Sequence, residues 1–159
     1  MKPTLFSLLL AAFSFGSKGM AQSTTSMSNS NTNLEEARKA IAESNEKFGR
    51  FLGQDDGSVA SLYADDAWIM PSNMPYLHGH DNILKFFSES YRLGVRSGKF
   101  TTLDVFGDGN EYVTEVGLVQ IFDANGNLFT DDKYMVIWKN TDKGWKMFRD
   151  TFNSNKPRK

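Results

Sequence analysis

Hydrophobic and polar positions alternate along the C-terminal part of the chain. The ranges 132–140 and 144–153 both repeat with the two-residue period of a β-strand, and a tight turn at residues 141–143 joins them. Aromatic residues stand at both parities of these strands, whereas an antiparallel sheet with one solvated face is polar on that face. We therefore expect both faces of the sheet to be covered, one by helices of the chain and the other by a second copy of it.

The preceding residues predict helices first and strands afterwards. Helical spacing of apolar residues, a capping box and helix-ending glycines predict three helices, at about residues 34–52, 59–63 and 81–94. Alternation and turn signals predict strands at residues 67–70, 99–106, 111–122, 128–140 and 144–153. Helices followed by a meander of strands are typical of an α+β fold with the helices on one face of the sheet. We therefore expect an antiparallel sheet of about four to five strands packed on three N-terminal helices.

The first residues are not expected to belong to the folded domain. A short basic start, an apolar run and small residues before position 22 are typical of a secretory signal peptide at residues 1–21, cleaved near Ala21. The apolar run is too short to span a bilayer, so we expect a secreted protein, periplasmic or extracellular, without membrane contact after cleavage. Residues 22–32 are rich in Ser, Thr and Asn and predict a disordered linker. The folded domain is expected at residues 33–155, followed by a basic tail at residues 156–159.

Charge and cysteine content exclude several classes of function. The formal net charge is −1, charges of both signs are scattered, and the tail is the only basic cluster, so we expect no nucleic-acid partner. The chain has no cysteine, which excludes disulfides and thiol nucleophiles. His78 and His80 could ligate a metal, but no third ligand stands at a suitable spacing, so a loop at a helix entry is the preferred interpretation. We expect neither a metal nor a cofactor.

Charged residues inside the predicted strands are the candidate polar contacts. Glu115, Lys133 and the pair Arg149 and Asp150 must face water, a partner charge or a ligand. Two interpretations of Glu115 are open: a cross-strand pair with Lys133 or Arg149, or a polar contact at the bottom of an apolar pocket. Arg149 and Asp150 have opposite parity, so at most one of them should point inward unless a bulge intervenes. Gly117 in the middle of a strand indicates a bulge or the close approach of another group.

Four segments together resemble one known superfamily. They are residues 62–67 (LYADDA), 77–83 (LHGHDNI), 133–138 (KYMVIW) and 144–154 (GWKMFRDTFNS). The set is similar to the NTF2-like superfamily, with SnoaL-like and DUF4440 domains as the nearest subgroup, and the resemblance covers nearly all of residues 34–154. It implies a cone-shaped α+β fold, in which a curved antiparallel sheet wraps around helices and leaves a pocket at the open end. It also implies a homodimer formed through the outer face of the sheet.

The ketosteroid isomerases of this superfamily provide a catalytic pattern that can be compared position by position. The place of their general base is held by Met70 and Pro71, which cannot accept a proton. The place of their oxyanion-binding tyrosine is held by Phe48, and Tyr134 stands near the place of their second oxyanion donor. The resemblance therefore argues against an isomerase of this type, and it assigns no catalytic residue.

Three functions remain open. The first is a domain that binds a small, partly apolar molecule without established catalysis. The second is a SnoaL-like isomerase, cyclase or hydrolase with Glu115 or Asp150 as proton carrier, and the third is a dimeric protein-interaction module. Asp150 is preferred over Arg149 as the inward residue, because the resembling domains often carry an acid there. The predicted pocket residues are Trp68, Met70, Phe87, Tyr91, Glu115, Lys133, Trp138 and Asp150.

Overall fold

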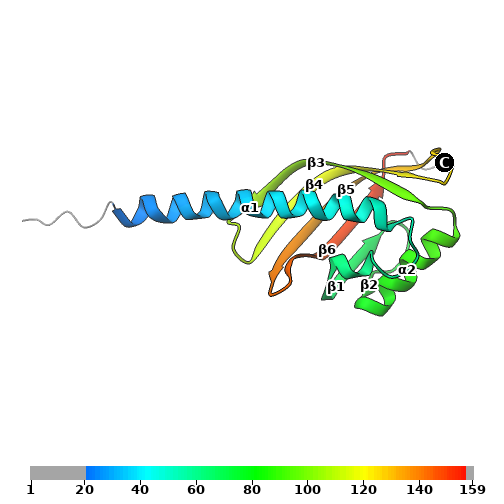
Figure 1. Cartoon of the computed structure of the whole chain (residues 1–159), viewed down its shortest axis with the longest axis horizontal. Coiled ribbons are helices and arrows are strands. Elements are labelled where there is room, and N and C mark those ends of the chain that lie inside the picture. The colour runs from blue at the N-terminus through cyan, green and yellow to red at the C-terminus, as the bar shows by residue number, and fades with distance from the viewer. Residues whose placement is uncertain (1–20, 157–159) are drawn as a thin grey trace, which may run out of the picture.

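This computed structural model describes residues 21–156 of the chain, and the predicted α+β fold is confirmed. The elements are, in chain order, α1 (Ala21–Phe51), a 3-10 helix (Ala60–Leu62), β1 (Tyr63–Pro71), β2 (Leu77–His78), α2 (His80–Arg92), β3 (Ser97–Gly107), β4 (Tyr112–Phe122), β5 (Leu128–Thr141) and β6 (Gly144–Ser154). Figure 1 shows α1 lying along a curved sheet, with α2 near its C-terminal end. The predicted signal peptide, apart from Ala21, and the basic tail beyond Lys156 lie outside the described residues.

The long helix α1 begins earlier than the sequence pattern predicts. Its assigned range starts at Ala21 and includes residues 22–32, for which we expected a disordered linker. In Figure 1 this first part of α1 extends beyond the edge of the sheet. Helix propagation adds one hydrogen bond for each residue that is ordered, so a helix anchored by its packed part can continue into a polar segment at low cost.

The packed part of α1 buries one stripe of side chains. Ala37, Ile41 and Phe48 are buried at helical spacing and belong to the hydrophobic core. Gly49 lies on the side that approaches β3, where an added Cβ would stand 2.2 Å from the carbonyl oxygen of Gly98. Only glycine at position 49 permits this approach, and it brings the C-terminal half of α1 close to the sheet.

The sheet is mixed and has six strands, in the order β2-β1-β6-β5-β4-β3. β3 to β6 form the predicted antiparallel meander, whereas β1 pairs with β6 in parallel. The expected number of four to five strands is therefore corrected to six, and the expected antiparallel sheet is corrected to a mixed one. The expected helix at residues 59–63 is only one 3-10 turn, and the strand that follows runs from Tyr63 to Pro71 rather than over residues 67–70. Local periodicity misses this pairing because the partners are about eighty residues apart in the sequence.

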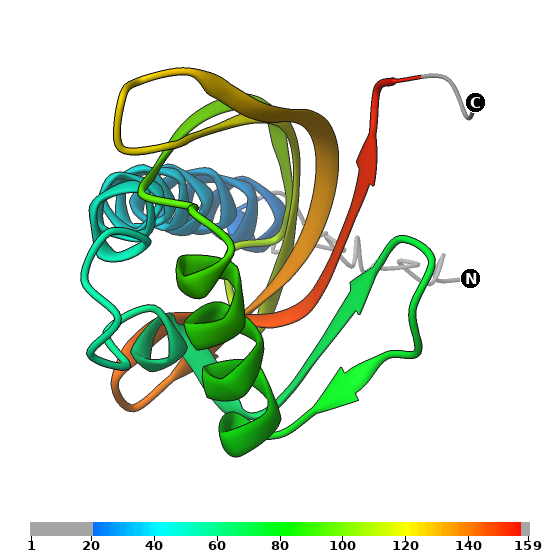
Figure 2. The ribbon, with the colours of Figure 1, turned by 90° about the vertical axis from the view of Figure 1, so that its right-hand side faces the viewer.

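The two faces of the sheet differ in their cover. Figure 2 looks into the open end of the curved sheet and shows α1 and α2 on its concave side. On the convex side, Leu118 and Met135 are 37% and 46% exposed, and Phe106 is also exposed. A second copy of the chain as the outer cover therefore stays a prediction. Within residues 21–156, no helix has the length and apolarity needed to cross a bilayer.

Candidate functional site

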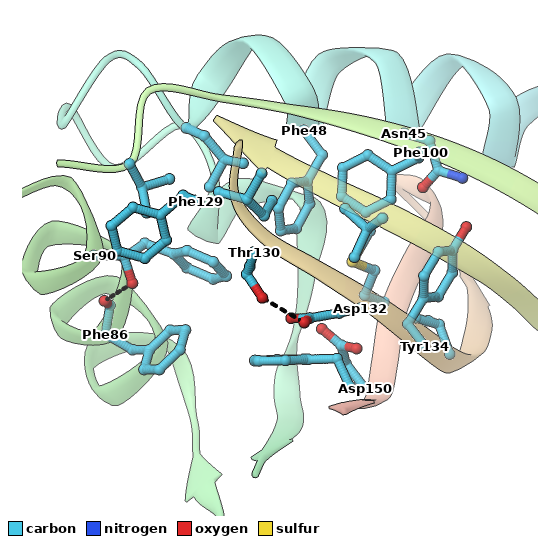
Figure 3. A pocket seen from close by; sticks show the side chains of 18 residues that line it. Asn45, Phe48, Phe86, Ser90, Phe100, Phe129, Thr130, Asp132, Tyr134 and Asp150 are labelled. Atoms are coloured by element: carbon cyan, nitrogen blue, oxygen red, sulfur yellow. Dashed lines mark hydrogen bonds between the residues drawn. The ribbon is translucent and has the colours of Figure 1, made fainter. Parts of the chain in front are cut away.

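A cavity of about 220 Å³ lies between the two α-helices and the concave face of the sheet. Much of its wall is aromatic and consists of Phe48, Phe86, Phe87, Phe100, Phe129 and Phe152. Aliphatic side chains and Met147 complete the apolar lining. The polar members of the wall are Asn45, Ser90, Thr130, Asp132, Tyr134 and Asp150 (Figure 3).

Simple periodicity places these side chains in the cavity. Thr130, Asp132 and Tyr134 stand at every second position of β5 and therefore point to the same, concave face. On α1, Asn45 and Phe48 are three residues apart, which places them on one face of the helix. The cavity is thus formed where the C-terminal half of α1 meets α2 and the central strands.

Aromatic rings in edge-to-face contact form the apolar wall. The ring of Phe48 lies 5.4 Å from that of Phe87 and 5.0 Å from that of Phe100, both in edge-to-face geometry. Phe100 in turn meets the ring of Tyr134 at 5.7 Å. Such contacts favour one arrangement of the rings, so this wall offers a defined apolar surface to a ligand.

Asp150 on β6 is a buried carboxyl group in the cavity wall. Only 6% of its surface is exposed, and the hydroxyl of Tyr63 on β1 donates a hydrogen bond of 2.7 Å to its Oδ2. Burial raises the pKa of Asp150 to about 6; the hydrogen bond from Tyr63 acts in the opposite direction, and the negative charge of Glu115 adds to the increase. A carboxyl group that exchanges a proton this close to neutral pH can serve as a general acid or base.

Asp132 on β5 is a second buried acid of the cavity, which the sequence analysis did not select. It is 8% exposed, and the hydroxyl of Thr130 donates a hydrogen bond of 2.6 Å to its Oδ1. No ion pair involves Asp132 or Asp150 among the described residues. The available signal was parity, since Asp132 stands two positions before Tyr134 and must share its face.

Glu115 on β4 lies just behind the cavity wall, fully buried, and accepts four hydrogen bonds. Tyr134 and Thr102 donate their hydroxyl groups to its Oε1 over 2.7 and 2.6 Å. Asn45 donates its amide to the same oxygen over 2.7 Å, and the indole of Trp138 donates to Oε2 over 3.0 Å. These donors replace the water that the buried carboxylate has lost.

The hydrogen bonds to Glu115 determine how the polar groups of Asn45 and Tyr134 are oriented. Because Asn45 directs its Nδ2 to Glu115, its Oδ1 points elsewhere, and that buried oxygen has no hydrogen-bond partner among the described residues. A buried acceptor without a partner costs about 1–3 kcal/mol. Burial, followed by the charge of Glu115, raises the pKa of Tyr134 far above its ordinary range, so its hydroxyl remains a donor to Glu115.

Solved bacterial structures share this architecture. An NTF2-like protein with a cystatin-like fold from Novosphingobium aromaticivorans aligns with a TM-score of 0.71 and 15% identity, over 90% of this chain and 94% of that one. A ketosteroid isomerase-like protein from Erwinia carotovora atroseptica aligns with a TM-score of 0.63 and 15% identity, over 80% of this chain and 99% of that one.

A proposed dehydratase of the NTF2-like family from Streptomyces avermitilis aligns with a TM-score of 0.60 and 16% identity, over 80% of this chain and 99% of that one. The chain therefore has the NTF2-like fold. No protein-family model matches the sequence, and neither does any curated protein. The likeness rests on three-dimensional arrangement, because the sequence identities are low.

This NTF2-like fold brings four of the predicted pocket residues to the cavity or directly behind it. Phe87 and Asp150 line the cavity. Trp138 is fully buried and reaches the site only through its hydrogen bond to Glu115. Of the two interpretations of Glu115, the cross-strand ion pair with Lys133 or Arg149 is wrong, because the partners of Glu115 are neutral donors.

The other four predicted pocket residues do not line this cavity. On β1 the buried residues Ala67 and Ile69 face the core, so Trp68 and Met70 point outward. The ring of Trp68 stacks on Tyr76 with 4.6 Å between centroids. The sequence identified these residues as apolar, but it did not show which parity of β1 faces inward.

Lys133 and Tyr91 were also predicted to line the pocket, and each lies elsewhere in the structure. Lys133 is exposed between two inward-facing neighbours on β5, and its Nζ donates to the side chain of Asn155 over 3.3 Å. Tyr91 belongs to α2 but faces a separate hollow of about 10 Å³, and the guanidinium of Arg96 stacks 3.7 Å from its ring. Tyr91 comes four residues after Phe87, in the last turn of α2, and its ring is held by Arg96 outside the cavity lining.

The residues at the catalytic positions of the ketosteroid isomerases do not form an isomerase site in this structure. Met70 faces away from the cavity, and Pro71 does not line it, so neither position supplies a base there. Phe48 lies in the wall without a hydroxyl, while Tyr134 lines the cavity with its hydroxyl held by Glu115. Over the described residues, no three or more His, Cys, Asp or Glu side chains form a group able to hold a metal ion.

Proposed function

We propose that this chain binds a small, largely apolar molecule in the cavity between its helices and sheet. The observation that carries the proposal is a cavity of about 220 Å³ with a mainly aromatic wall and two buried carboxyl groups, Asp132 and Asp150. A cavity of about 150 Å³ accommodates benzene, and drug-sized ligands use roughly 300–1,000 Å³. The cavity volume therefore fits a molecule with one or two rings.

A cavity-filling variant tests this proposal. Ser90 on α2 lines the cavity, and its hydroxyl donates only to the carbonyl oxygen of Phe86 in the same helix, so Ser90→Leu fills space without removing a tertiary hydrogen bond. We expect small aromatic compounds to raise the melting temperature of the wild type by mass action, and Ser90→Leu to abolish the shift. Lys85→Leu, on an exposed position of α2, is the matched control and should retain it. Equal shifts in both variants would locate binding elsewhere and contradict the proposal.

A second function is favoured by Asp150. Its pKa of about 6 and its place in an apolar wall are those of a general acid or base, as a SnoaL-like isomerase, cyclase or hydrolase would require. Exchange of the α-protons of small cyclic ketones in D2O, followed by NMR, is a direct assay of proton transfer. Asp150→Asn should abolish the exchange while the ketone still binds; exchange that survives the substitution would exclude Asp150 as the base.

Two further parts of the proposal concern the setting of this domain. We propose a homodimer formed through the convex face of the sheet, which is supported by the exposed apolar side chains of Leu118 and Met135. We also propose export, with removal of residues 1–21, on the basis of the N-terminal pattern. Intact-mass measurement of the exported protein should give a chain that begins at Gln22; a chain that retains Met1 contradicts export by this route.

A further inference from the structure

The polar groups of the cavity wall have no donor left for a ligand. The hydroxyl of Ser90 donates to the carbonyl of Phe86, and that of Thr130 donates to Asp132 (Figure 3). Tyr134 donates to Glu115 behind the wall, and the amide nitrogen of Asn45 donates to Glu115 and, over 3.4 Å, to the hydroxyl oxygen of Thr102. Each of these hydrogen bonds is internal to the protein.

The acceptors, by contrast, remain available to a ligand. Thr130 occupies Oδ1 of Asp132, and Tyr63 occupies Oδ2 of Asp150, so each carboxyl group keeps one oxygen without a protein donor among the described residues. The Oδ1 of Asn45 also has none, but this oxygen is almost completely enclosed by the protein, so the two carboxyl groups are the acceptors within reach of a ligand. A ligand that fits these groups has to bring hydrogen-bond donors.

The charge of the cavity wall also favours a ligand that brings hydrogen-bond donors. Among the described residues that line the cavity there are two acids, Asp132 and Asp150, and no Lys, Arg or His. The carboxylate of Glu115 lies behind the cavity wall, where it accepts the hydroxyl of Tyr134, and its charge acts on Asp150. Aromatic rings form much of the wall, and a cation that meets the face of such a ring is attracted to it, which adds to this preference.

We propose that the cavity selects a small ring-bearing amine in its protonated form, whose ammonium group is bound by Asp150, while the negative charge of Asp132 on the same concave face adds to the attraction. This inference rests on the proposed small-molecule function and narrows its ligand to one chemical class. The ring occupies the phenylalanine-lined part of the cavity, and the ammonium hydrogens supply the donors that the wall lacks. A carboxylate of the same shape is repelled by the two acids and finds no donor.

Three probes of similar shape test the inference: 2-phenylethylamine, 2-phenylethanol and phenylacetate. Isothermal titration of the full chain at pH 7.5 should give the tightest binding for the amine, roughly tenfold weaker binding for the alcohol and no measurable binding for phenylacetate. Equal binding of the amine and the alcohol, or tighter binding of phenylacetate, overturns the inference but leaves the small-molecule function standing. Binding of none of the three overturns both.

Carboxamide variants separate charge from shape. Asp150→Asn should weaken binding of 2-phenylethylamine by roughly tenfold and Asp132→Asn should weaken it less, with little change for 2-phenylethanol in either variant. The matched control is Asp131→Asn, which removes the same charge from the neighbouring residue of β5 that does not line the cavity. A loss of amine binding in the control as large as that in the cavity variants would assign the effect to the overall charge and contradict the inference.

A pH profile gives a readout that depends on this site. The titratable groups around Asp150 are Tyr63 on β1, Glu115 on β4, and Asp132 and Tyr134 on β5, while α1 and α2 contribute only uncharged cavity residues. Protonation of Asp150 near pH 6 removes the charged partner of the ammonium group, so amine affinity should fall as the pH is lowered from 7.5 to 5. Alcohol affinity should stay nearly constant. An amine profile as flat as that of the alcohol contradicts the role of Asp150.

Discussion

Gly117 on β4 lies directly opposite Tyr134 on β5, and the ring of Tyr134 occupies the space where any other residue at position 117 would carry its Cβ. A Cβ built there would stand 2.5 Å from both Cζ and Oη of Tyr134, well inside the closest real contacts. The missing side chain lets the tyrosine lie flat enough to place its hydroxyl 2.7 Å from Glu115. Glycine in this strand is therefore a condition for the hydrogen bonds around Glu115.

Gly117→Ala should consequently displace Tyr134 and break its hydrogen bond to Glu115. We expect the free energy of unfolding, measured by urea denaturation, to fall by about 2–4 kcal/mol, because overpacking and an unsatisfied buried acceptor act together. A double-mutant cycle provides the control: in a Tyr134→Ala background, Gly117→Ala should cost less, with only the carbonyl of Thr101, 2.7 Å from the added Cβ, still in the way. Equal costs in both backgrounds would show that Tyr134 is not the obstacle.

Glu115→Gln tests whether the buried carboxylate is held by its four donors. The glutamine amide has the same shape as the carboxylate, but its NH2 group replaces an oxygen that accepts a hydrogen bond and therefore faces another donor. We expect a loss of about 2–4 kcal/mol in the free energy of unfolding. Glu111→Gln, at an exposed position shortly before, is the matched control and should change stability little. Since the charge of Glu115 contributes to the raised pKa of Asp150, the same variant should also lower that pKa.

The raised pKa of Asp150 predicts a pH-dependent penalty on stability. The pKa rises from an ordinary value of 3.8 to about 6, so between these pH values the folded protein holds a proton that the unfolded chain releases. The penalty therefore grows as the pH rises from about 4 to 6 and stays constant above it, at about 3 kcal/mol or less. Relative to the wild type, Asp150→Asn should gain stability over this range in urea denaturation.

The exposed carboxyl group of Asp142 in the β5–β6 turn offers a matched control for that profile. Asp142→Asn should follow the wild-type curve at every pH, because its side chain does not leave water on folding. If Asp150→Asn follows the wild-type curve as well, burial does not raise the pKa of Asp150.

The convex face of the sheet can be tested with one charge. Met135 lies opposite Val116 and Thr151 on the neighbouring strands and is 46% exposed. If a second copy covers this face, Met135→Lys places a charge in the interface and should weaken the dimer roughly a hundredfold, as measured by sedimentation equilibrium. Asp142→Lys, which adds the same side chain at an exposed turn, should leave the dimer intact. A wild type that sediments as a monomer at high concentration contradicts the dimer itself.

Periodicity predicted much of the fold and little of the cavity. The meander β3–β6 and α2 were correctly predicted because alternation and helical stripes reflect which side chains are buried within each element. The parallel pairing of β1 with β6 was not, since hydrogen bonds between distant segments leave no local pattern. Trp68 and Met70 were wrongly assigned to the pocket for another reason. Alternation separates the two faces of a strand, but it does not show which face is turned to the core.

The hydrogen-bond partners and the burial of the acidic residues could be predicted only in part from the sequence. Opposite parity restricted Arg149 and Asp150 to one inward residue, and a glycine in mid-strand signalled a close approach at Gly117. That Glu115 accepts from Asn45 and Trp138, and that Asp132 shares a cavity with Asp150, depends on elements separated by tens of residues. Side-chain chemistry and spacing are local and can be taken from the chain, whereas the direction of each donor and the burial that shifts a pKa arise only when distant strands and helices pack together.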